Sequence, residues 1–184
     1  MSLVKSNHFE VGKKAPEFKL INTVDNKINE LSELKGKNGT AIFFICNHCP
    51  FVIHINKELV AIANSYLKKG INFIAISSND ISYYPQDGPK YMKQVALNLK
   101  YPFPYLFDEH QEVAKAYDAT CTPDLYLFDE NLESVYHGQL DNSRPGNGIQ
   151  VTGNDFRNAL DFLLEKKVNN NKPTPSIGCS IKWK

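Results

Sequence analysis

The sequence predicts an α/β fold in which a central sheet is covered on both faces. The run 40–45 is continuously apolar, which is typical of a strand that is buried on both sides, and 71–77 is predicted as the next buried strand. Between them apolar residues recur at helical spacing, so the order is strand, helix, strand. Such an order implies a right-handed parallel crossover, the basic unit of an α/β sheet.

A short hairpin is predicted ahead of this unit. Residues 18–21 and 27–31 are strand-like and flank the turn residues Asp25 and Asn26. A lysine- and glycine-rich stretch at 35–39 then breaks the chain before the first buried strand.

The helix of the crossover is predicted to begin at Pro50. It runs for about 18 residues and ends at Lys68, Lys69 and Gly70, which supply cations and a glycine where a helix should stop. The side chains predicted to face the core are Val52, Ile55, Leu59, Ile62 and Tyr66.

The second half of the chain predicts smaller elements. These are a helix at 91–99, a weak strand at 106–107, a short helix at 109–117, a hairpin of 124–128 with 134–137 that turns at Glu130 and Asn131, and an amphipathic helix at 155–167 with Phe156, Leu160, Leu163 and Leu164 inward.

The chain divides into one domain, 1–168, and a linker with a C-terminal tail, 169–184. Residues 169–175 are polar and carry two prolines, whereas 177–183 contains apolar residues and the only tryptophan. We therefore expect the tail to dock back onto the domain.

Composition excludes several classes of function. With 42% hydrophobic residues, 22% charged residues and a net charge of +1, the chain lacks the basic excess expected of a nucleic-acid-binding protein. Its apolar runs fall far short of the roughly 20 residues that span a bilayer, so no membrane contact is expected. Residues 1–10 do not resemble a signal peptide, and four cysteines are too few for a secreted disulfide framework. A cytoplasmic protein is predicted.

The motif Cys46-Asn47-His48-Cys49-Pro50 lies directly after the first buried strand. Two thiols three positions apart at a strand-to-helix junction indicate redox chemistry. The reactive form of cysteine is the thiolate, which a helix N-terminus stabilises. We expect Cys46 to hold that position and attack, His48 to stabilise its anion, Cys49 to resolve the mixed disulfide, and Asn47 to contribute to substrate binding.

A second motif, Cys121-Thr122-Pro123-Asp124, precedes a predicted strand. A cis peptide at Pro123 would present the backbone of Thr122 to an extended substrate, and an ordinary trans proline opening an edge strand is the alternative. Cys121 is either a further substrate-contacting thiol or a small buried apolar group. For Cys179 in the tail, packing is favoured over a position capping the site.

Together with the opening segment 11–20, these motifs resemble those of the thioredoxin fold and, more narrowly, of peroxiredoxin-like redoxins of the AhpC/TSA superfamily with a C-N-H-C-P motif. The resemblance covers nearly the whole chain, including segment 136–148 and tail 176–184. It implies a three-layer α/β/α architecture with a mixed sheet, an N-terminal hairpin extension, a C-x-x-C pair at Cys46 and Cys49, and a cis-proline at Pro123.

The chain departs from its relatives at three points. Thioredoxins carry tryptophan where this chain has Ile45, and many carry a buried carboxylate on the preceding strand, where 40–45 has none. Proton transfer must then use His48, water or another group. The P-x-x-x-T/S-x-x-C pattern of peroxiredoxins is absent around both Cys46 and Cys49.

Three functional hypotheses remain, none requiring an organic cofactor. The first is a thiol-disulfide oxidoreductase that serves a thiol or disulfide substrate and is recycled by a reductant or oxidant. The second is a thiol peroxidase in which Cys46 is oxidised to a sulfenic acid that Cys49 resolves. The third is a copper- or zinc-binding protein, although no second C-x-x-C or H-x-x-x-H supplies further ligands. His54 is expected on a solvated face, Arg144 either binds a carboxylate or closes its loop, and the oligomeric state is left open.

Overall fold

The computed structural model describes residues 3–169 and 172–184, so Asn170 and Asn171 of the predicted linker lie outside the described residues. Its elements in chain order are β1 (Leu3–Lys5), β2 (Lys19–Asn22), β3 (Ile28–Glu30), α1 (Leu31–Leu34), β4 (Gly39–Phe44), α2 (Pro50–Leu67), β5 (Ile71–Ser77), the 3₁₀ turn η1 (Pro85–Asp87), α3 (Pro89–Asn98), β6 (Tyr105–Phe107), α4 (Glu112–Ala116), β7 (Cys121–Thr122), β8 (Asp124–Phe128), β9 (Ser134–Gly138), α5 (Asn154–Leu164) and β10 (Ile177–Ser180).

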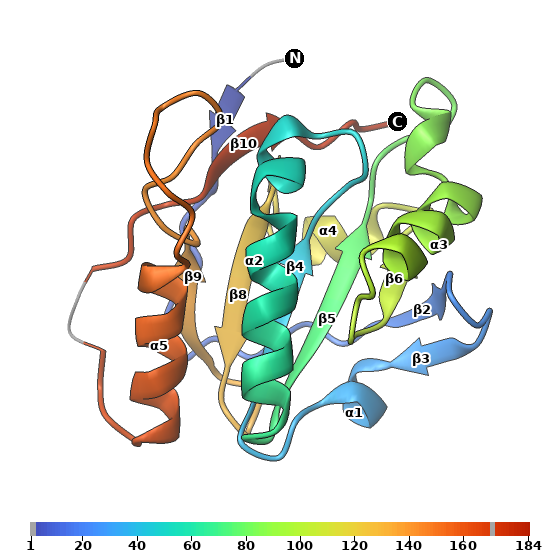
Figure 1. The fold of residues 1–184 in the computed structure, drawn as a ribbon. Helices are drawn as coiled ribbons and strands as arrows, with labels where there is room; N and C mark the ends of the chain where they lie inside the picture. Colours follow the sequence, from blue (N-terminus) through green and yellow to red (C-terminus); the bar gives the residue numbers. More distant parts are fainter. Residues whose placement is uncertain (1–2, 170–171) are drawn as a thin grey trace.

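The main sheet of the described chain has the strand order β3-β2-β6-β5-β4-β8-β9. β4 is parallel to β5 and antiparallel to β8, so the sheet is mixed. Helices α2, α3 and α5 cover one face, and α4 lies behind the sheet on the other (Figure 1). The predicted three-layer α/β/α architecture is therefore confirmed.

Alternate residues of β4 enter two different cores. Ala41 and Phe43 pack with α2, α3 and α5, whereas Ile42 and Phe44 pack with α4 and with Phe9 from the N-terminal segment. All of β4 is buried, which explains why its sequence is continuously apolar rather than alternating.

Most predicted elements lie within two residues of their expected bounds, and α2 has the predicted 18 residues. The helix predicted at 109–117 is shorter, because Gln111 adopts a left-handed conformation with φ 61° and α4 begins only after it. The last helix ends early at Leu164, and Leu163 and Leu164 are half-buried rather than fully inward.

The end of the chain forms part of a second sheet that the sequence does not predict. β10 lies between β1 and β7 and is antiparallel to both. This small sheet crosses the end of the molecule at which β4 ends and α2 begins (Figure 1). It therefore lies over the C-x-x-C motif.

Among the described residues, no helix combines the length and apolarity needed to cross a bilayer.

Candidate active site

The two cysteines of the motif occupy different positions relative to α2 from those expected. Cys49, not Cys46, is the N-cap residue, because the helix begins at Pro50, which suits a first helical position. Cys46 lies one turn earlier, in the loop that follows β4. The prediction that Cys46 occupies the helix N-terminus is wrong, and the stabilising position belongs to Cys49.

Both sulfurs contact Thr122. The Sγ of Cys46 lies 3.4 Å from the Thr122 hydroxyl, and the Sγ of Cys49 lies 3.1 Å from the Thr122 carbonyl oxygen. The Thr122–Pro123 peptide bond is cis, as the sequence predicts. Thr122, at the end of β7, thus contacts both cysteines of the motif.

The pKa values of the two thiols shift in opposite directions. Hydrogen bonds from Cys46, from Cys179 and from the Val52 amide lower the pKa of Cys49 to about 5 despite its burial. The bond to Cys49, burial and the nearby carboxylate of Asp87 raise the pKa of Cys46 well above its usual value. Of the two thiols, Cys49 is therefore the easier to ionise.

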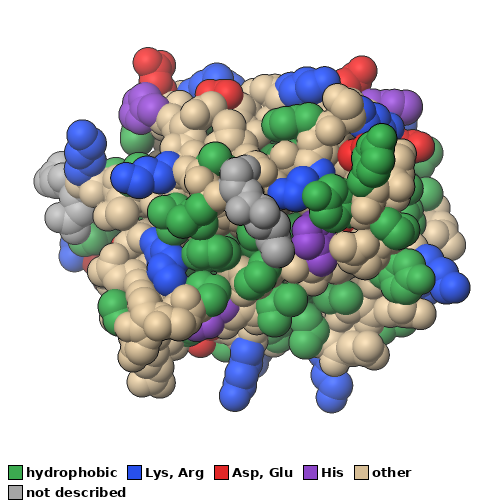
Figure 2. Space-filling view, turned by 90° about the horizontal axis from the view of Figure 1, so that it is seen from above, with side chains coloured by type: hydrophobic (Ala, Val, Ile, Leu, Met, Phe, Trp, Pro, Cys, Tyr) green, Lys and Arg blue, Asp and Glu red, His purple; other side chains and the backbone are tan. Residues whose placement is uncertain are grey.

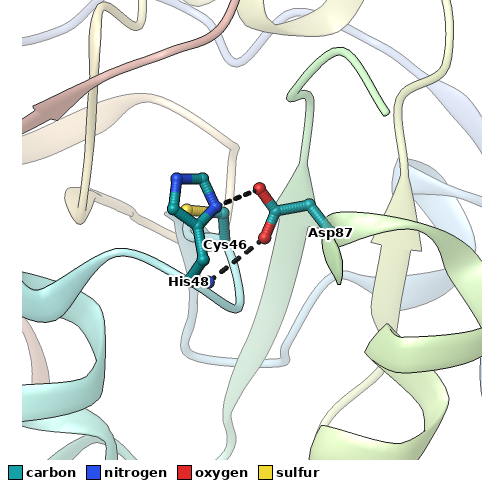
Figure 3. Close-up of side chains that lie close together, drawn as sticks. All are labelled: Cys46, His48 and Asp87. Atoms are coloured by element: carbon teal, nitrogen blue, oxygen red, sulfur yellow. Dashed lines mark hydrogen bonds and ion pairs between the residues drawn. The ribbon is translucent and has the colours of Figure 1, made fainter. Parts of the chain in front are cut away.

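His48 is held by a carboxylate that the sequence did not reveal. Its Nδ1 lies 2.5 Å from Oδ2 of Asp87, a fully buried residue at the end of η1 (Figure 3). Oδ1 of Asp87 also accepts the backbone N–H groups of Asn47, at 2.8 Å, and of His48, at 3.2 Å. A carboxylate is an acceptor only, so it fixes the imidazole proton on Nδ1.

The other ring nitrogen of His48 is buried and has no hydrogen-bond partner among the described residues. The ring stacks on Tyr84 at 4.9 Å, and Cys46 Sγ, a ring nitrogen and an Asp87 oxygen all lie within 4.8 Å of one another. Figure 3 shows the sulfur of Cys46 behind the imidazole. In the neutral imidazole the lone pair is therefore on Nε2, and the ring lies close to the thiol that must lose a proton.

Cys46, His48 and Asp87 lie close enough together to hold a metal ion, but the oxygens of Asp87 are already occupied. Asp87 accepts four hydrogen bonds, the fourth at 2.8 Å from the Asn79 amide, so both lone pairs of each oxygen are occupied. A metal ion would have to displace donors that hold the loop in place. The residues present do not fit a metal site.

In this conformation the sulfurs are closed off, with Cys46 exposing 1% and Cys49 0% of their surface. Tyr84 covers His48, and Lys182 Nζ of the tail lies 5.7 Å from the Tyr84 ring centroid. Viewed from this end, the surface shows hydrophobic side chains mixed with Lys and Arg, and few acidic ones (Figure 2). A substrate reaches the thiols only when part of this cover moves.

Three other residues were predicted to contact the substrate: Asn47 and Cys121 make contacts within the protein, whereas Pro123 lines a cavity. The Asn47 side chain bonds the Gln86 carbonyl and Tyr105 hydroxyl, so it holds the loop instead of meeting a substrate. Pro123 lines a cavity of about 20 Å³, enough for one water. Cys121 is fully buried, its Sγ lies 3.8 Å from the Pro123 carbonyl oxygen, and burial raises its pKa, which favours the small buried apolar group of the two alternatives.

His54 and Arg144 both make side-chain hydrogen bonds within the protein. His54 Nε2 bonds the Ser143 hydroxyl at 2.7 Å, so it does not lie on a purely solvated face. The Arg144 guanidinium donates to the carbonyls of Asp141 and Ser143 and to Gln139, so it closes its own loop.

The tail occupies the edge that the sequence assigned to an extended substrate. Cys179 of β10 is paired in register with Thr122, and its Sγ lies 3.0 Å from that of Cys49. Cys179 is packed in the core, as favoured, and it also caps the site, which was the alternative.

Sequence reasoning missed Asp87 and Asn79. Asp87 lies in Pro85-Gln86-Asp87-Gly88-Pro89, which indicates a turn, and Asn79 follows the end of a buried strand. Polar residues after a strand that is parallel to β4 were the only available signal, because such strand ends meet at one edge of the sheet. Nothing in the spacing identified His48 as their partner.

Comparison with known proteins gives a consistent assignment. A model described as the AhpC/TSA family matches residues 11–136. No curated protein matches the chain. An uncharacterized conserved protein from Geobacillus kaustophilus is similar at 59% identity with a TM-score of 0.98, covering 100% of this chain and 97% of its own. A hypothetical protein from Sinorhizobium meliloti 1021 is similar at 41% identity, with a TM-score of 0.95 and 98% of each chain covered.

A more distant structure supports the fold alone. The thioredoxin domain of a thiol-disulfide oxidoreductase from Bacteroides vulgatus is 16% identical, with a TM-score of 0.62 over 88% of this chain and 100% of its own. The predicted thioredoxin-like fold is thereby confirmed.

Proposed function

Because the chain belongs to the AhpC/TSA family, a family of thioredoxin-fold redoxins, we propose that it is a thiol-disulfide oxidoreductase that uses Cys46 and Cys49 as its dithiol-disulfide couple. One observation carries the proposal: the sulfurs of Cys46 and Cys49 both contact Thr122, one at its hydroxyl and one at its carbonyl oxygen, beside the cis-proline. Two cysteines three positions apart whose sulfurs meet the same residue need little backbone movement to form a bond.

The residues divide the reaction into two steps. In the first, Nε2 of His48 takes the proton of Cys46, whose thiolate attacks a substrate disulfide and releases one substrate thiolate. In the second, the Cys49 thiolate attacks the Cys46 sulfur of the mixed disulfide and releases the other substrate thiolate. The substrate gains two electrons, and the site is left as a Cys46–Cys49 disulfide.

The charge distribution suits these roles. A resolving thiol that is already ionised attacks without waiting for a base, and the lowered pKa of Cys49 provides this at neutral pH. Cys46 needs a base, and the Asp87-oriented imidazole lies beside it. In this proposal the thiolate is at the resolving position and the base lies beside the attacking thiol.

The proposal includes partners and a setting. The substrate is a thiol or disulfide, a separate reductant or oxidant recycles the site, and the reaction takes place in the cytoplasm, since four cysteines do not make a secreted framework. Substrate access requires displacement of β10, because Cys179 covers the sulfur of Cys49.

The test uses glutathione disulfide as the probe with a Cys49→Ser variant. We expect this variant to accumulate a glutathione adduct on Cys46 that peptide mapping detects, while the wild type resolves the adduct into a Cys46–Cys49 disulfide. Cys121→Ser is the matched control and should behave as the wild type. An adduct on Cys46 that persists equally in both proteins would refute resolution by Cys49.

The same proteins separate this function from peroxidase chemistry. The peroxidase motif is absent from the sequence. Neither of the two arginines supplies a positive charge to the cysteines, because Arg144 bonds its own loop and Arg157 pairs with Glu58. We expect stoichiometric hydrogen peroxide to oxidise Cys46 no faster than an ordinary thiol. Rapid loss of the Cys46 thiol in a single turnover would contradict the assignment.

A further inference from the structure

The C-terminal strand brings a third thiol to the redox pair. β10 pairs with β7 so that Cys179 lies opposite Thr122, the residue that contacts both sulfurs of the motif. The Sγ atoms of Cys49 and Cys179 lie 3.0 Å apart. A disulfide bond is about 2.05 Å long, so about 1 Å of movement separates this contact from a covalent bond.

The position of the tail is specified by the chain on both sides of Cys179. A Cβ on Gly178 would lie 2.0 Å from the Thr122 carbonyl oxygen, so only glycine allows β10 to approach this closely. Beyond Cys179, the Ile181 amide bonds the Thr120 carbonyl at 2.9 Å, and the Lys182 carbonyl accepts the Asp80 amide at 2.8 Å. Contacts on both sides fix the thiol against Cys49.

The tail is also connected to the base of the site. The Asn79 side chain donates to Asp87, which holds His48, and accepts the Lys182 amide at 2.9 Å. The docked tail and the oriented imidazole therefore share one hydrogen-bond network.

We propose that Cys179 is a third redox thiol, which exchanges with the oxidised pair to form a Cys49–Cys179 disulfide. In this step the Cys179 sulfur attacks Cys49 Sγ, the Cys46–Cys49 bond breaks, and the proton lost by Cys179 passes to Cys46. No electrons enter or leave the protein. The inference rests on the proposed function, because that reaction produces the Cys46–Cys49 disulfide.

The electrostatics change in the direction that the exchange needs. In the reduced site, burial, the hydrogen bond with Cys49 and the charge of Cys49 raise the pKa of Cys179 to about 12, against a lowering effect of Lys182. Two of these three raising causes come from Cys49. They are removed when Cys49 enters a disulfide, so Cys179 becomes easier to ionise when its target is formed.

The exchange has a functional consequence. It regenerates the Cys46 thiol beside His48 and ties β10 to the start of α2 through a Cys49–Cys179 bond. The recycling partner would then be a dithiol reductant that breaks this bond, after which β10 is again held only by non-covalent contacts. Cys121 is not assigned this role, because its Sγ lies against the Pro123 carbonyl oxygen, at 3.8 Å.

The experiment uses the full-length protein equilibrated in glutathione redox buffers, quenched with acid and mapped by mass spectrometry. In Cys46→Ser we expect a Cys49–Cys179 disulfide, and in Cys46→Ser/Cys179→Ser we expect none. Cys46→Ser/Cys121→Ser is the matched control and should retain it. Partly oxidised wild type, which avoids any folding defect of the variants, should contain both the Cys46–Cys49 and the Cys49–Cys179 linkages.

The outcomes distinguish the two proposals. If the wild type forms only Cys46–Cys49 and Cys46→Ser forms no internal disulfide, the exchange is overturned and the proposed function stands. If no Cys46–Cys49 disulfide forms at any potential while Cys49–Cys179 does, the proposed function is overturned and the tail thiol is the redox partner of Cys49. Absence of both linkages overturns both.

Discussion

Replacing Asp87 with asparagine tests how the site holds its base. The change keeps the shape of the side chain but replaces one acceptor oxygen with a donor NH₂ group. If that group takes the place of Oδ1, it opposes the backbone N–H groups of Asn47 and His48. The better arrangement puts it at Oδ2, where it faces His48 Nδ1 and the Asn79 amide.

In that arrangement the stability cost follows from the contacts. The two backbone bonds to Oδ1 survive but lose the charge of their acceptor, at about 1 kcal/mol each, and the Asn79 amide loses its acceptor, at about 1 to 3 kcal/mol. The expected loss in the free energy of unfolding is therefore about 3 to 5 kcal/mol. Asn79 cannot flip to compensate without breaking its bond to the Lys182 amide.

The same substitution should invert the imidazole. The new NH₂ group donates to Nδ1, so the proton moves to Nε2 and the base beside Cys46 is lost. Nitrogen chemical shifts of the His48 ring report the tautomer, chemical denaturation reports stability, and alkylation reports the reactivity of Cys46, which should fall by roughly tenfold or more.

The control is Asp129→Asn, where a single oxygen accepts the amides of Asn131 and Glu133 and an asparagine can keep both bonds. A stability loss below about 1 kcal/mol for Asp87→Asn, together with a proton that remains on Nδ1, would refute the account of the dyad.

Three further predictions concern the sulfurs and the tail. The folded-state pKa of Cys49, about 5, is below its unfolded value, so its ionisation stabilises the reduced protein above the unfolded pKa, and this stabilisation is lost as pH falls through about 5. The ultraviolet absorbance of the Cys49 thiolate should disappear over the same pH window. A midpoint near the ordinary cysteine pKa would contradict the assignment. In Gly178→Ala, the new methyl group should clash with the Thr122 carbonyl oxygen, displace β10 and raise the alkylation rate of Cys49 several-fold. The control Gly146→Ala is strained at φ 81° but lies in open space, so it should leave that rate unchanged. Equal rates in both variants would count against a tail that covers the site. Thr122→Val removes the hydroxyl that lowers the pKa of Cys46, so the pH at which Cys46 becomes reactive should rise, and an unchanged pH profile would show that this contact has no effect.

The sheet could be predicted because its strands are buried on both faces. The runs 40–45 and 71–77 are mostly apolar for that reason, and the spacing of Val52, Ile55 and Leu59 reflects the face that α2 turns to the core. These signals are local, so one sequence is enough to read them.

The second sheet could not be predicted, because its pairing is non-local. β7 has two residues, and it meets β10 across more than 50 positions of chain, as in the pairing of Thr122 with Cys179. Gly178 is the only trace of that close approach in the sequence, and a glycine before a cysteine indicates no particular partner.

The candidate site was predicted as a set of residues but not as a set of roles. The motif identified Cys46, His48 and Cys49, yet the start of α2 at Pro50 reversed which sulfur receives the helix N-terminus. The carboxylate that sequence reasoning sought on the strand before the motif is supplied by Asp87, which is 39 positions from His48.

The most direct test of the dithiol-disulfide couple is a redox titration of the wild-type protein in glutathione buffers at pH 7, with the Cys46–Cys49 linkage measured by peptide mapping. A thiolate that is stable at the working pH favours the reduced form, so we predict a reversible midpoint above about −270 mV, the value for thioredoxin. Failure to form this linkage at any potential, or a midpoint below about −300 mV, typical of a structural disulfide, would contradict the account.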